Sequence, residues 1–306
     1  MTQTSLSSRA WIELAILALI WGGSFLSIRI ALDEIGPLTA VLHRTGWAML
    51  VLWAVVAAMR LPLPRAPRVW VAFFVMGLLN NVIPFSLMAW GQLHIPSGLT
   101  SILNAATAIW GVVLAAALFA DERLSPRKGL GVALGFAGVV TAIGWTNLTA
   151  LDPSSLAQWA VLGGTLSYAC AGAWGRARLR GVPPVLSAAG MLTASTLIML
   201  PLAIWSEGVP SLVLHPVTWG AIAYFALVAT ALAYLLYYRV LAMAGSGNLL
   251  LVTLLIPPVA IALGAWVRAE ALPAHAFAGF ALLALGLAVL DGRLLRPLKG
   301  LTPRRG

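Results

Sequence analysis

The run "PLTAVLHRTGWAMLVLW", residues 37–53, is apolar along almost its whole length, yet it carries a histidine and an arginine side by side at His43 and Arg44. As a helix it would be about 25 Å long, close to the thickness of the hydrocarbon core of a bilayer. A charged side chain inside such a helix is costly unless it finds a polar partner or reaches the interface. The stretch therefore predicts a membrane-spanning helix in which the arginine has a specific role.

The whole chain has the composition of a membrane protein. Of its 306 residues, 61% are hydrophobic and 9% are charged, whereas a soluble domain carries about 25% charged residues. So few polar side chains cannot cover a water-soluble globule, and we expect an all-α integral membrane protein. The net charge of +10 would indicate nucleic-acid binding only on a soluble fold with a basic face, so no nucleic-acid partner is expected. The single cysteine, Cys170, excludes an intrachain disulfide.

Ten segments are long and apolar enough to cross a bilayer, which takes about 20 residues. The connections between them are short and rich in Pro, Gly, Asn and Asp, so none has room for a soluble domain. The first apolar run shows no small-residue cleavage pattern, which favours a retained span over a signal peptide. The predicted spans are residues 10–32, 37–59, 69–92, 98–120, 126–146, 156–176, 184–205, 217–239, 248–267 and 275–292.

The distribution of basic residues predicts the orientation. With the N-terminus in the cytoplasm, 16 of the 19 Lys and Arg residues fall in inside regions, Arg268 falls outside, and Arg29 and Arg44 lie within spans. Because Lys and Arg are enriched in cytoplasmic loops, both termini are predicted to be cytoplasmic. The acidic residues assigned to the outside are Asp33, Glu34, Asp152, Glu207 and Glu270.

The two halves of the chain align without a gap at an offset of 148 residues, which predicts repeats over residues 1–148 and 149–306. Each half holds five predicted spans, and because five is odd the second half enters the membrane from the opposite side. Inverted-topology repeats are typical of secondary transporters, whose substrate site lies near the midplane between the repeats. We therefore expect a transporter rather than an enzyme. The most informative matches are Trp11 with Trp159, Thr45 with Thr193, Glu122 with Glu270, Gly131 with Gly279 and Gly138 with Gly286.

Several stretches resemble the drug/metabolite transporter superfamily, and within it the ten-span EamA-type exporters. They are "WGGSF" at 21–25, the arginine of "LHRTG" at 42–46, "LFADERLSPRKGLGVALGFAGVV" at 118–140 and its second copy "WVRAEALPAHAFAGFALLALGL" at 266–287. The chain is most similar to the YddG-type exporters of amino acids. Many relatives have a proline in the fourth span, whereas this chain reads "SILNAATAIWG" there and keeps "IPP" at 256–258 in the ninth.

The resemblance implies export of amino acids, including aromatic ones, or of similar small organic metabolites. It places the protein in a bacterial inner membrane and implies a cavity built from spans 1, 3, 4, 6, 8 and 9, with spans 5 and 10 as peripheral supports. The expected partners are a small-molecule substrate and the lipid bilayer, with the chain as a monomer or weak homo-oligomer. No cofactor or metal is expected.

Polar and aromatic side chains within spans are candidates for the substrate site, because in lipid they usually face the bundle interior or a cavity. Asn80 and Asn81 precede Pro84, so they either satisfy carbonyls freed at a proline kink or bind the amino or carboxyl group of a substrate. The candidate substrate-binding residues are Trp21, Ser24, His43, Arg44, Asn80, Asn81, Thr100, Asn104, Thr107, Trp110, Tyr168, Trp174, Tyr234 and Thr253.

Helical spacing gives some of these candidates a shared face. Thr100, Asn104 and Thr107 are three and four residues apart, so on a regular helix they share one face, which we expect to line a cavity and Trp110 to continue. Pro257 removes a hydrogen bond to the carbonyl of Thr253, and the resulting kink either acts as a gating hinge or shapes the bundle.

The charged candidates leave two alternatives open. Arg44 either snorkels outward or faces the bundle to bind carbonyls or a substrate carboxylate, and the resemblance favours the inward orientation. No Asp or Glu lies in the middle of a predicted span, so proton coupling would use His43 or be absent. Arg239 is assigned to the interface, and Glu122 and Glu270 to interfacial anchors or loop ion pairs.

Three other functions are alternatives to amino-acid export. A multidrug or cationic-metabolite exporter of the same superfamily would share the architecture. An intramembrane serine protease would use Ser24 of "GGSF" as nucleophile and His43 as base, but it would not need a duplicated fold. A channel would give flux that scales linearly with solute concentration instead of saturating.

Overall fold

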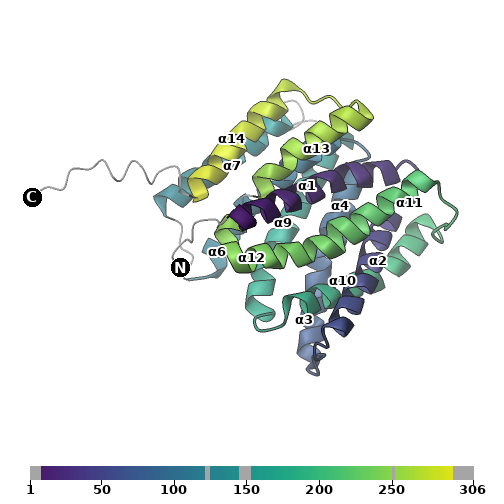
Figure 1. Cartoon of the computed structure of the whole chain (residues 1–306). Helices are drawn as coiled ribbons and strands as arrows, with labels where there is room; N and C mark the ends of the chain where they lie inside the picture. The colour runs from purple at the N-terminus through teal and green to yellow at the C-terminus, as the bar shows by residue number, and fades with distance from the viewer. Residues whose placement is uncertain (1–7, 121–124, 145–152, 250–251, 292–306) are drawn as a thin grey trace, which may run out of the picture.

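The computed structural model describes residues 8–120, 125–144, 153–249 and 252–291, and within them every regular element is a helix (Figure 1). Proline begins many of these helices, because its missing N–H is not needed in the first turn. The elements are α1 (Ser8–Ala31), α2 (Pro37–Ala58), α3 (Pro67–Gly77), η1 (Leu78–Val82), α4 (Ile83–Gly91), α5 (Ser97–Asn104), α6 (Ala106–Leu118), α7 (Pro126–Ile143), α9 (Pro153–Arg178), α10 (Pro184–Glu207), α11 (Pro216–Ala223), η2 (Tyr224–Leu232), α12 (Ala233–Leu249), α13 (Val252–Arg268) and α14 (Ala274–Asp291).

Six helical runs are long and apolar enough to cross a membrane, and two shorter helices, Leu255–Arg268 and Ala274–Leu290, are also apolar. Large apolar side chains such as Trp205 and Trp266, which are 85% and 83% exposed, point out of the bundle where lipid would cover them. The chain is therefore a multi-pass membrane protein. The six runs are Ser8–Ala31, Pro37–Ala58, Pro67–Gly91, Ser97–Leu118, Pro184–Glu207 and Pro216–Val240.

Six of the ten predicted spans coincide with the six long runs, and the ninth and tenth fall on the two shorter helices. The predicted spans 126–146 and 156–176 fall on α7 and α9, which are helical but are not among these runs. The eighth span was predicted to end at 239, but α12 continues to Leu249 through the stretch "AGSG" at 244–247, which we expected to be a loop. A glycine costs only about 1 kcal/mol inside a helix. Because no proline lies between residues 217 and 256, nothing in the sequence forces the helix to end there.

The helix boundaries repeat at the offset of 148 residues. Helix α7 at 126–143 corresponds to α14 at 274–291, and α2 corresponds to α10 within one residue at each end. The two π-helices also correspond, because η1 shifted by 148 residues covers 226–230, inside η2. Since π-helical turns are rare and often lie at functional sites, their recurrence at equivalent positions singles out this level of the bundle.

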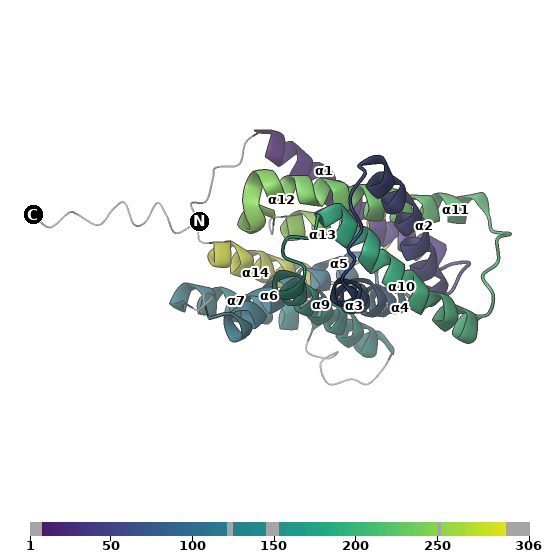
Figure 2. The ribbon, with the colours of Figure 1, turned by 90° about the horizontal axis from the view of Figure 1, so that it is seen from below.

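Corresponding helices α7 and α14 pack against each other at one edge of the molecule (Figures 1 and 2). Gly131 near the start of α7 faces the carbonyl of Gly286 near the end of α14, and Ala142 near the end of α7 faces Gly279 near the start of α14. The two helices are therefore antiparallel, and their glycines let the backbones approach closely.

Corresponding helices α2 and α10 also pack antiparallel. The indole of Trp53, late in α2, donates to the hydroxyl of Thr193 in α10 at 2.8 Å. At the other end the Glu207 carboxylate, which ends α10, accepts from the backbone N–H groups of Leu38 and Thr39 at 2.9 and 2.8 Å. The carboxylate thus caps α2, where it also meets the positive end of the helix dipole.

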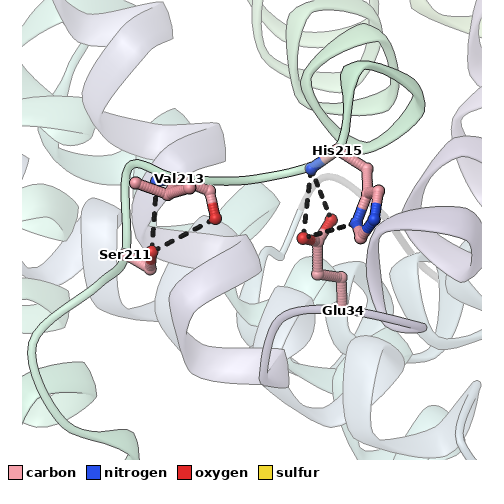
Figure 3. Close-up of polar contacts among 4 residues, drawn as sticks. All are labelled: Glu34, Ser211, Val213 and His215. Atoms are coloured by element: carbon pink, nitrogen blue, oxygen red, sulfur yellow. Dashed lines mark hydrogen bonds and ion pairs between the residues drawn. The ribbon is translucent and has the colours of Figure 1, made fainter.

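We call the end of the bundle that carries Asp33, Glu34, Glu207 and Glu270 the acidic end, and each of these carboxylates joins a loop to another part of the bundle. Glu34 accepts from the backbone N–H of His215 at 3.1 Å and lies 2.9 Å from its ring Nδ1, just before α11 begins (Figure 3). In the same connection Ser211 Oγ bonds the backbone of Val213. The Glu34 carboxylate thereby ties the α1–α2 connection to α11.

Glu270 caps α5 instead of forming a loop ion pair. Its Oε2 accepts from Ser97 Oγ at 2.7 Å and from the backbone N–H of Gly98 at 3.4 Å. The predicted alternatives for Glu270 were an interfacial anchor or a loop ion pair, and they overlooked this N-terminal cap. Glu122, the corresponding residue of the first repeat, lies outside the described residues.

Asp33 joins the ends of α1 and α13. Its carboxylate accepts from Arg29 Nη1 at 2.9 Å and from both Nη atoms of Arg268. The hydrogen bond from Arg268 and the positive charges of both arginines hold the pKa of the Asp33 carboxyl below its ordinary value. The carboxylate is therefore ionised throughout the neutral range.

Gly138 tests the α7–α14 contact. A Cβ at this position would lie 2.5 Å from the backbone N of Leu283, so Gly138→Leu should lower the free energy of unfolding by about 1–3 kcal/mol through overpacking. The matched control is Gly129→Leu on the same helix, because nothing lies within 4 Å of a Cβ there. Thermal unfolding in detergent measures both, and equal losses of stability would contradict the packing.

The ionic contact of Asp33 predicts a pH dependence. Because its folded pKa lies below the ordinary value of 3.8, its contribution to stability is present above about pH 4 and is lost as pH falls through the folded pKa. Wild type should therefore unfold at a higher temperature than Asp33→Asn at pH 7 and at about pH 5, with the gap narrowing as the pH falls below about 4. A gap that stays constant across this range would show that the charge of Asp33 is not responsible.

Candidate functional site

The two π-helices direct polar groups into the middle of the bundle. A π-turn breaks the regular hydrogen-bond ladder, so its carbonyls need other donors. The hydroxyl of Ser167 on α9 donates to the carbonyl of Leu79 in η1 at 2.7 Å. In η2 the hydroxyl of Thr230 donates to the carbonyl of Phe225 at 2.8 Å. Both irregular turns are thus satisfied inside the protein.

A hydrogen-bonded network of four side chains crosses from η1 to α10 and α12. Asn80 Nδ2 donates to Tyr234 Oη at 3.1 Å, and Tyr234 Oη donates to Asn81 Oδ1 at 3.2 Å. Asn81 Nδ2 donates to Ser195 Oγ at 2.9 Å. The network therefore links the first half of the chain to the second, and it brings together three of the predicted site residues with Ser195, which the sequence did not single out.

Arg44 faces the interior of the bundle. Its Nε donates to Thr230 Oγ1 on η2 at 2.9 Å, and its guanidinium carbon lies 3.9 Å from the centroid of the Phe85 ring. The Phe85 ring in turn contacts the ring of Tyr168 at a centroid distance of 6.3 Å. No carboxylate lies within ion-pair distance of Arg44 in the part of the chain that the structure describes.

The cavity beside Arg44 is small. It has a volume of about 10 Å³ and is lined by Ile28, Ala40, Val41, Arg44, Phe85 and Ala89. That is about the space of one water molecule. The described conformation is therefore closed around Arg44, and a bound solute would require the helices that carry these residues to move apart.

His43 occupies a different environment from Arg44, as their separation of about 100° around the helix predicts. It is 8% exposed, its Nδ1 accepts from the Trp47 indole at 3.1 Å, and its ring meets Trp219 edge-on at 5.7 Å. Its Nε2 is buried without a hydrogen-bond partner among the described residues. Because Nδ1 accepts, the neutral ring carries its proton on Nε2, and this N–H is free to donate to a ligand.

The "WGGSF" stretch packs α1 against its neighbours. Trp21 Nε1 donates to the carbonyl of Ala229 in η2 at 3.2 Å, and Gly23 leaves room for the Tyr224 hydroxyl. The Ser24 hydroxyl donates to the Trp21 carbonyl at 2.7 Å and makes no hydrogen bond to His43. Ser24 and His43 thus do not form the hydrogen-bonded pair that the protease alternative requires.

The fourth predicted span is one apolar run, Ser97–Leu118, with a single irregular turn at Ala105 between α5 and α6. The backbone of Ala105 keeps a right-handed helical conformation, with φ −65° and ψ −15°, so the shared face of Thr100, Asn104 and Thr107 stays a prediction. The hydroxyl of Thr107 donates to the Asn104 carbonyl at 2.8 Å. The ring of Trp110 packs on the ring of Phe136 in α7, with 4.8 Å between the two centroids. Trp110 therefore lies on the side of the bundle where α7 packs against α14.

Two buried polar atoms in this region have no hydrogen-bond partner among the described residues, namely Asn104 Oδ1 and Trp110 Nε1. Of the remaining candidates, Trp174 donates to the carbonyl of Ala72 at 3.1 Å. Thr253 is half-buried in α13, which remains helical through Pro257 and the proline after it. The hydrogen bonds of Trp174 and Thr107 thus go to neighbouring backbone carbonyls and not to Arg44.

An ion pair between Glu13 and Arg239 was missed from the sequence. Glu13 is 7% exposed on α1, and its Oε1 accepts from Arg239 Nη2 of α12 at 2.6 Å and from Arg9 Nε at 3.2 Å. Arg239, which is expected at the interface, is half exposed and pairs with this buried carboxylate. The spacing of four residues between Arg9 and Glu13 was the available signal.

The comparisons with known proteins agree with this fold. The model of the EamA-like transporter family matches residues 9–144 and matches again over residues 155–290. The chain belongs to this family. It is therefore a transporter and not an enzyme. Among the described residues there is no group of three His, Cys, Asp or Glu side chains that could hold a metal ion.

The curated relatives are distant. The chain is 25% identical to an uncharacterized transporter of Archaeoglobus fulgidus, over 82% of this chain and 86% of that protein. It is 29% identical to Protein PagO of Salmonella typhimurium, over 47% and 46% of the two chains. It is 30% identical to a probable terminal-alkyne amino-acid exporter of Streptantibioticus cattleyicolor, over 45% and 46%.

A solved crystal structure has the same fold. It matches with a TM-score of 0.68 at 19% identity and covers 94% of this chain and 98% of its own. At this identity the match shows the fold alone.

Tyr234 tests the polar network. Tyr234→Phe removes the hydroxyl that joins the two asparagines, so a buried amide donor and acceptor lose a partner, and the free energy of unfolding should fall by about 1–3 kcal/mol. Tyr238→Phe is the matched control, because no hydrogen bond of its hydroxyl is seen among the described residues. Chemical or thermal unfolding in detergent compares the two, and equal effects would contradict a special role for Tyr234.

Proposed function

We propose that this EamA-family protein is a secondary transporter that exports amino acids or similar small organic metabolites by alternating access. Ten spans form two inverted five-span repeats over residues 1–148 and 149–306. The protein lies in a bacterial inner membrane with both termini in the cytoplasm and the acidic end outside. The substrate site lies between the repeats, around Arg44 and the Asn80–Asn81–Tyr234 network.

The inverted arrangement is supported by the packing of corresponding helices. Helices α7 and α14 occupy equivalent positions in the two repeats and are antiparallel, and the same holds for α2 and α10. If both members of such a pair cross the membrane, they cross it in opposite directions. Two repeats related in this way can exchange conformations, which opens the site to each side in turn.

The observation that carries the substrate assignment is the guanidinium of Arg44. It is held by one hydroxyl and one aromatic ring and has no carboxylate partner among the described residues. A cation in this environment is costly unless an anion compensates it, and a carboxylate can bond a guanidinium through two parallel hydrogen bonds. The geometry therefore favours a substrate that brings a carboxylate of its own.

The surroundings of Arg44 fit the rest of an amino acid. The amides of Asn80 and Asn81 and the hydroxyl of Tyr234 can bond an ammonium group or a second polar group, because each carries both donors and acceptors or can rotate to present either. Aromatic rings such as Phe85 and Tyr168 suit an apolar side chain. The printed function of one relative, amino-acid export, agrees with this substrate class.

A positive site argues against the cationic exporter alternative. Two like charges at about 4 Å repel each other by about 4 kcal/mol at the effective dielectric constant of a protein, so a cationic drug near Arg44 would be disfavoured. The proposal accordingly predicts selectivity for zwitterions and anions over cations.

Counterflow in proteoliposomes tests the function. The purified full chain, loaded with one unlabelled amino acid at a time, should accumulate the labelled form from outside, and flux should saturate. Repeating the assay with and without a pH gradient tests whether a proton is coupled and thereby whether His43 has a role. Flux of cationic drugs or of nucleotide-linked sugars without flux of any amino acid would overturn the substrate class.

Substitution of Arg44 tests the site. Arg44→Gln should raise the half-saturation concentration for amino acids by about tenfold or more, because a charge-assisted bond is lost. Arg44→Lys should raise it less, because the positive charge remains. Arg65→Gln, which replaces an exposed arginine in the α2–α3 connection, is the matched control. Unchanged half-saturation in Arg44→Gln would place the substrate elsewhere.

A further inference from the structure

A second pocket lies at the acidic end of the bundle, apart from the cavity at Arg44. It has a volume of about 300 Å³ and is formed where α1 and α13 end and where α4 connects to α5. Its lining includes Arg29, His94, Arg268 and Glu270. A pocket of this size and with these groups can hold a small polar molecule.

Two guanidiniums of this pocket already hold one carboxylate. Arg29 Nη1 and both Nη atoms of Arg268 donate to Asp33. A guanidinium has five N–H donors, and in the part of the chain that the structure describes Arg29 uses only one of them. The pair therefore has the geometry that binds a carboxylate and has donors left for a second one.

A negatively charged side chain, Glu270, lines the same pocket as the two guanidiniums. Glu270 uses Oε2 to cap α5 through Ser97 and Gly98, and its Oε1 has no hydrogen bond to any described residue. This oxygen can accept from an ammonium group. A pocket that presents two cations and one free carboxylate oxygen suits a zwitterion better than either a simple anion or a simple cation.

The pocket also lies where a substrate of the proposed transporter would pass. The helices that meet at it come from both repeats, α1, α4 and α5 from the first and α13 from the second, and the proposed function places the substrate path between the repeats. The acidic end is the outer side in that proposal. A solute released from Arg44 toward the outside would therefore reach this pocket before leaving the protein.

We propose that this pocket is a second amino-acid site, in which Arg29 and Arg268 bind the carboxylate and Glu270 binds the ammonium group. Asp33 is an internal carboxylate that competes with the substrate for the two guanidiniums. The assignment rests on the proposed function for its substrate class. It adds an outer site to the central one, so that export proceeds through two successive carboxylate-binding arginine sites.

Binding to the detergent-solubilised full chain tests this assignment. Isothermal titration with L-phenylalanine, L-leucine and L-threonine should show two sites in wild type and one remaining site in Arg44→Gln. In the Arg44→Gln background, Arg268→Gln should weaken the remaining site by about tenfold or more. Asp33→Asn should instead tighten it by about threefold or more, because the competing charge is gone. A purely structural Asp33 would give no gain in affinity.

Analogues separate the two halves of the site. Glu270→Gln should weaken the binding of L-phenylalanine. It should leave the affinity for 3-phenylpropionate, which lacks the ammonium group, unchanged. Phenylalaninamide, which lacks the carboxylate, should not respond to Arg268→Gln. If Arg268→Gln does not fold, as judged by gel filtration, Arg29→Gln replaces it, because Arg29 pairs only with Asp33 among the described residues.

Failure of this inference differs from failure of the proposed function. The second site is overturned if none of the three amino acids binds the Arg44→Gln protein, or if Asp33→Asn and the arginine variants leave the affinity unchanged. The proposed function fails if wild type shows no amino-acid counterflow, whatever binds at the acidic end. Counterflow in a protein with one binding site would keep the proposed function and remove this site.

Discussion

A bilayer interior offers no water to bond a free N–H or C=O group, and the arrangement of this protein follows from that constraint. All regular elements among the described residues are helices, so most backbone groups bond within their own segment. Where the ladder is irregular, in η1 and η2, hydroxyls such as those of Ser167 and Thr230 supply the missing donors. Irregular turns are tolerated only in the interior of the bundle, where neighbouring side chains can bond their carbonyls. This restricts the polar groups to the level of the bundle where Arg44 lies.

The two ends of the bundle are held together by different interactions. At the acidic end, carboxylates cap helices or bridge arginines, and they tie each loop to a different helix. At the opposite end of α1, Glu13 pairs with Arg239 of α12. The residues that correspond to this pair at the offset of 148 are Val161 and Gly91, which make an apolar contact. The repeats therefore share a backbone arrangement but differ in the side chains that make the equivalent contacts.

Much of the architecture could be predicted from the sequence because it depends on hydrophobicity and on local signals. Apolar runs, helix-starting prolines and the offset of 148 residues anticipated the helices and their repetition. Glycines such as Gly138 and Gly279 were expected at close helix contacts, and the structure confirms this. The extension of α12 to Leu249 was missed because glycine propensity is weak compared with tertiary context, and the irregular turn at Ala105 between α5 and α6 was missed because no proline marks it.

What the sequence by itself determined is a helical membrane protein of two repeats with an arginine inside its second span. Only the tertiary structure decided the partners of the polar groups: Arg44 with Thr230 and Phe85, Asn80 and Asn81 with Tyr234, and Asp33 with two arginines. The physical reason is distance along the chain. Hydrophobic periodicity is a local property that each segment carries alone, whereas these contacts join residues that are mostly more than 100 positions apart and form only when the helices have packed.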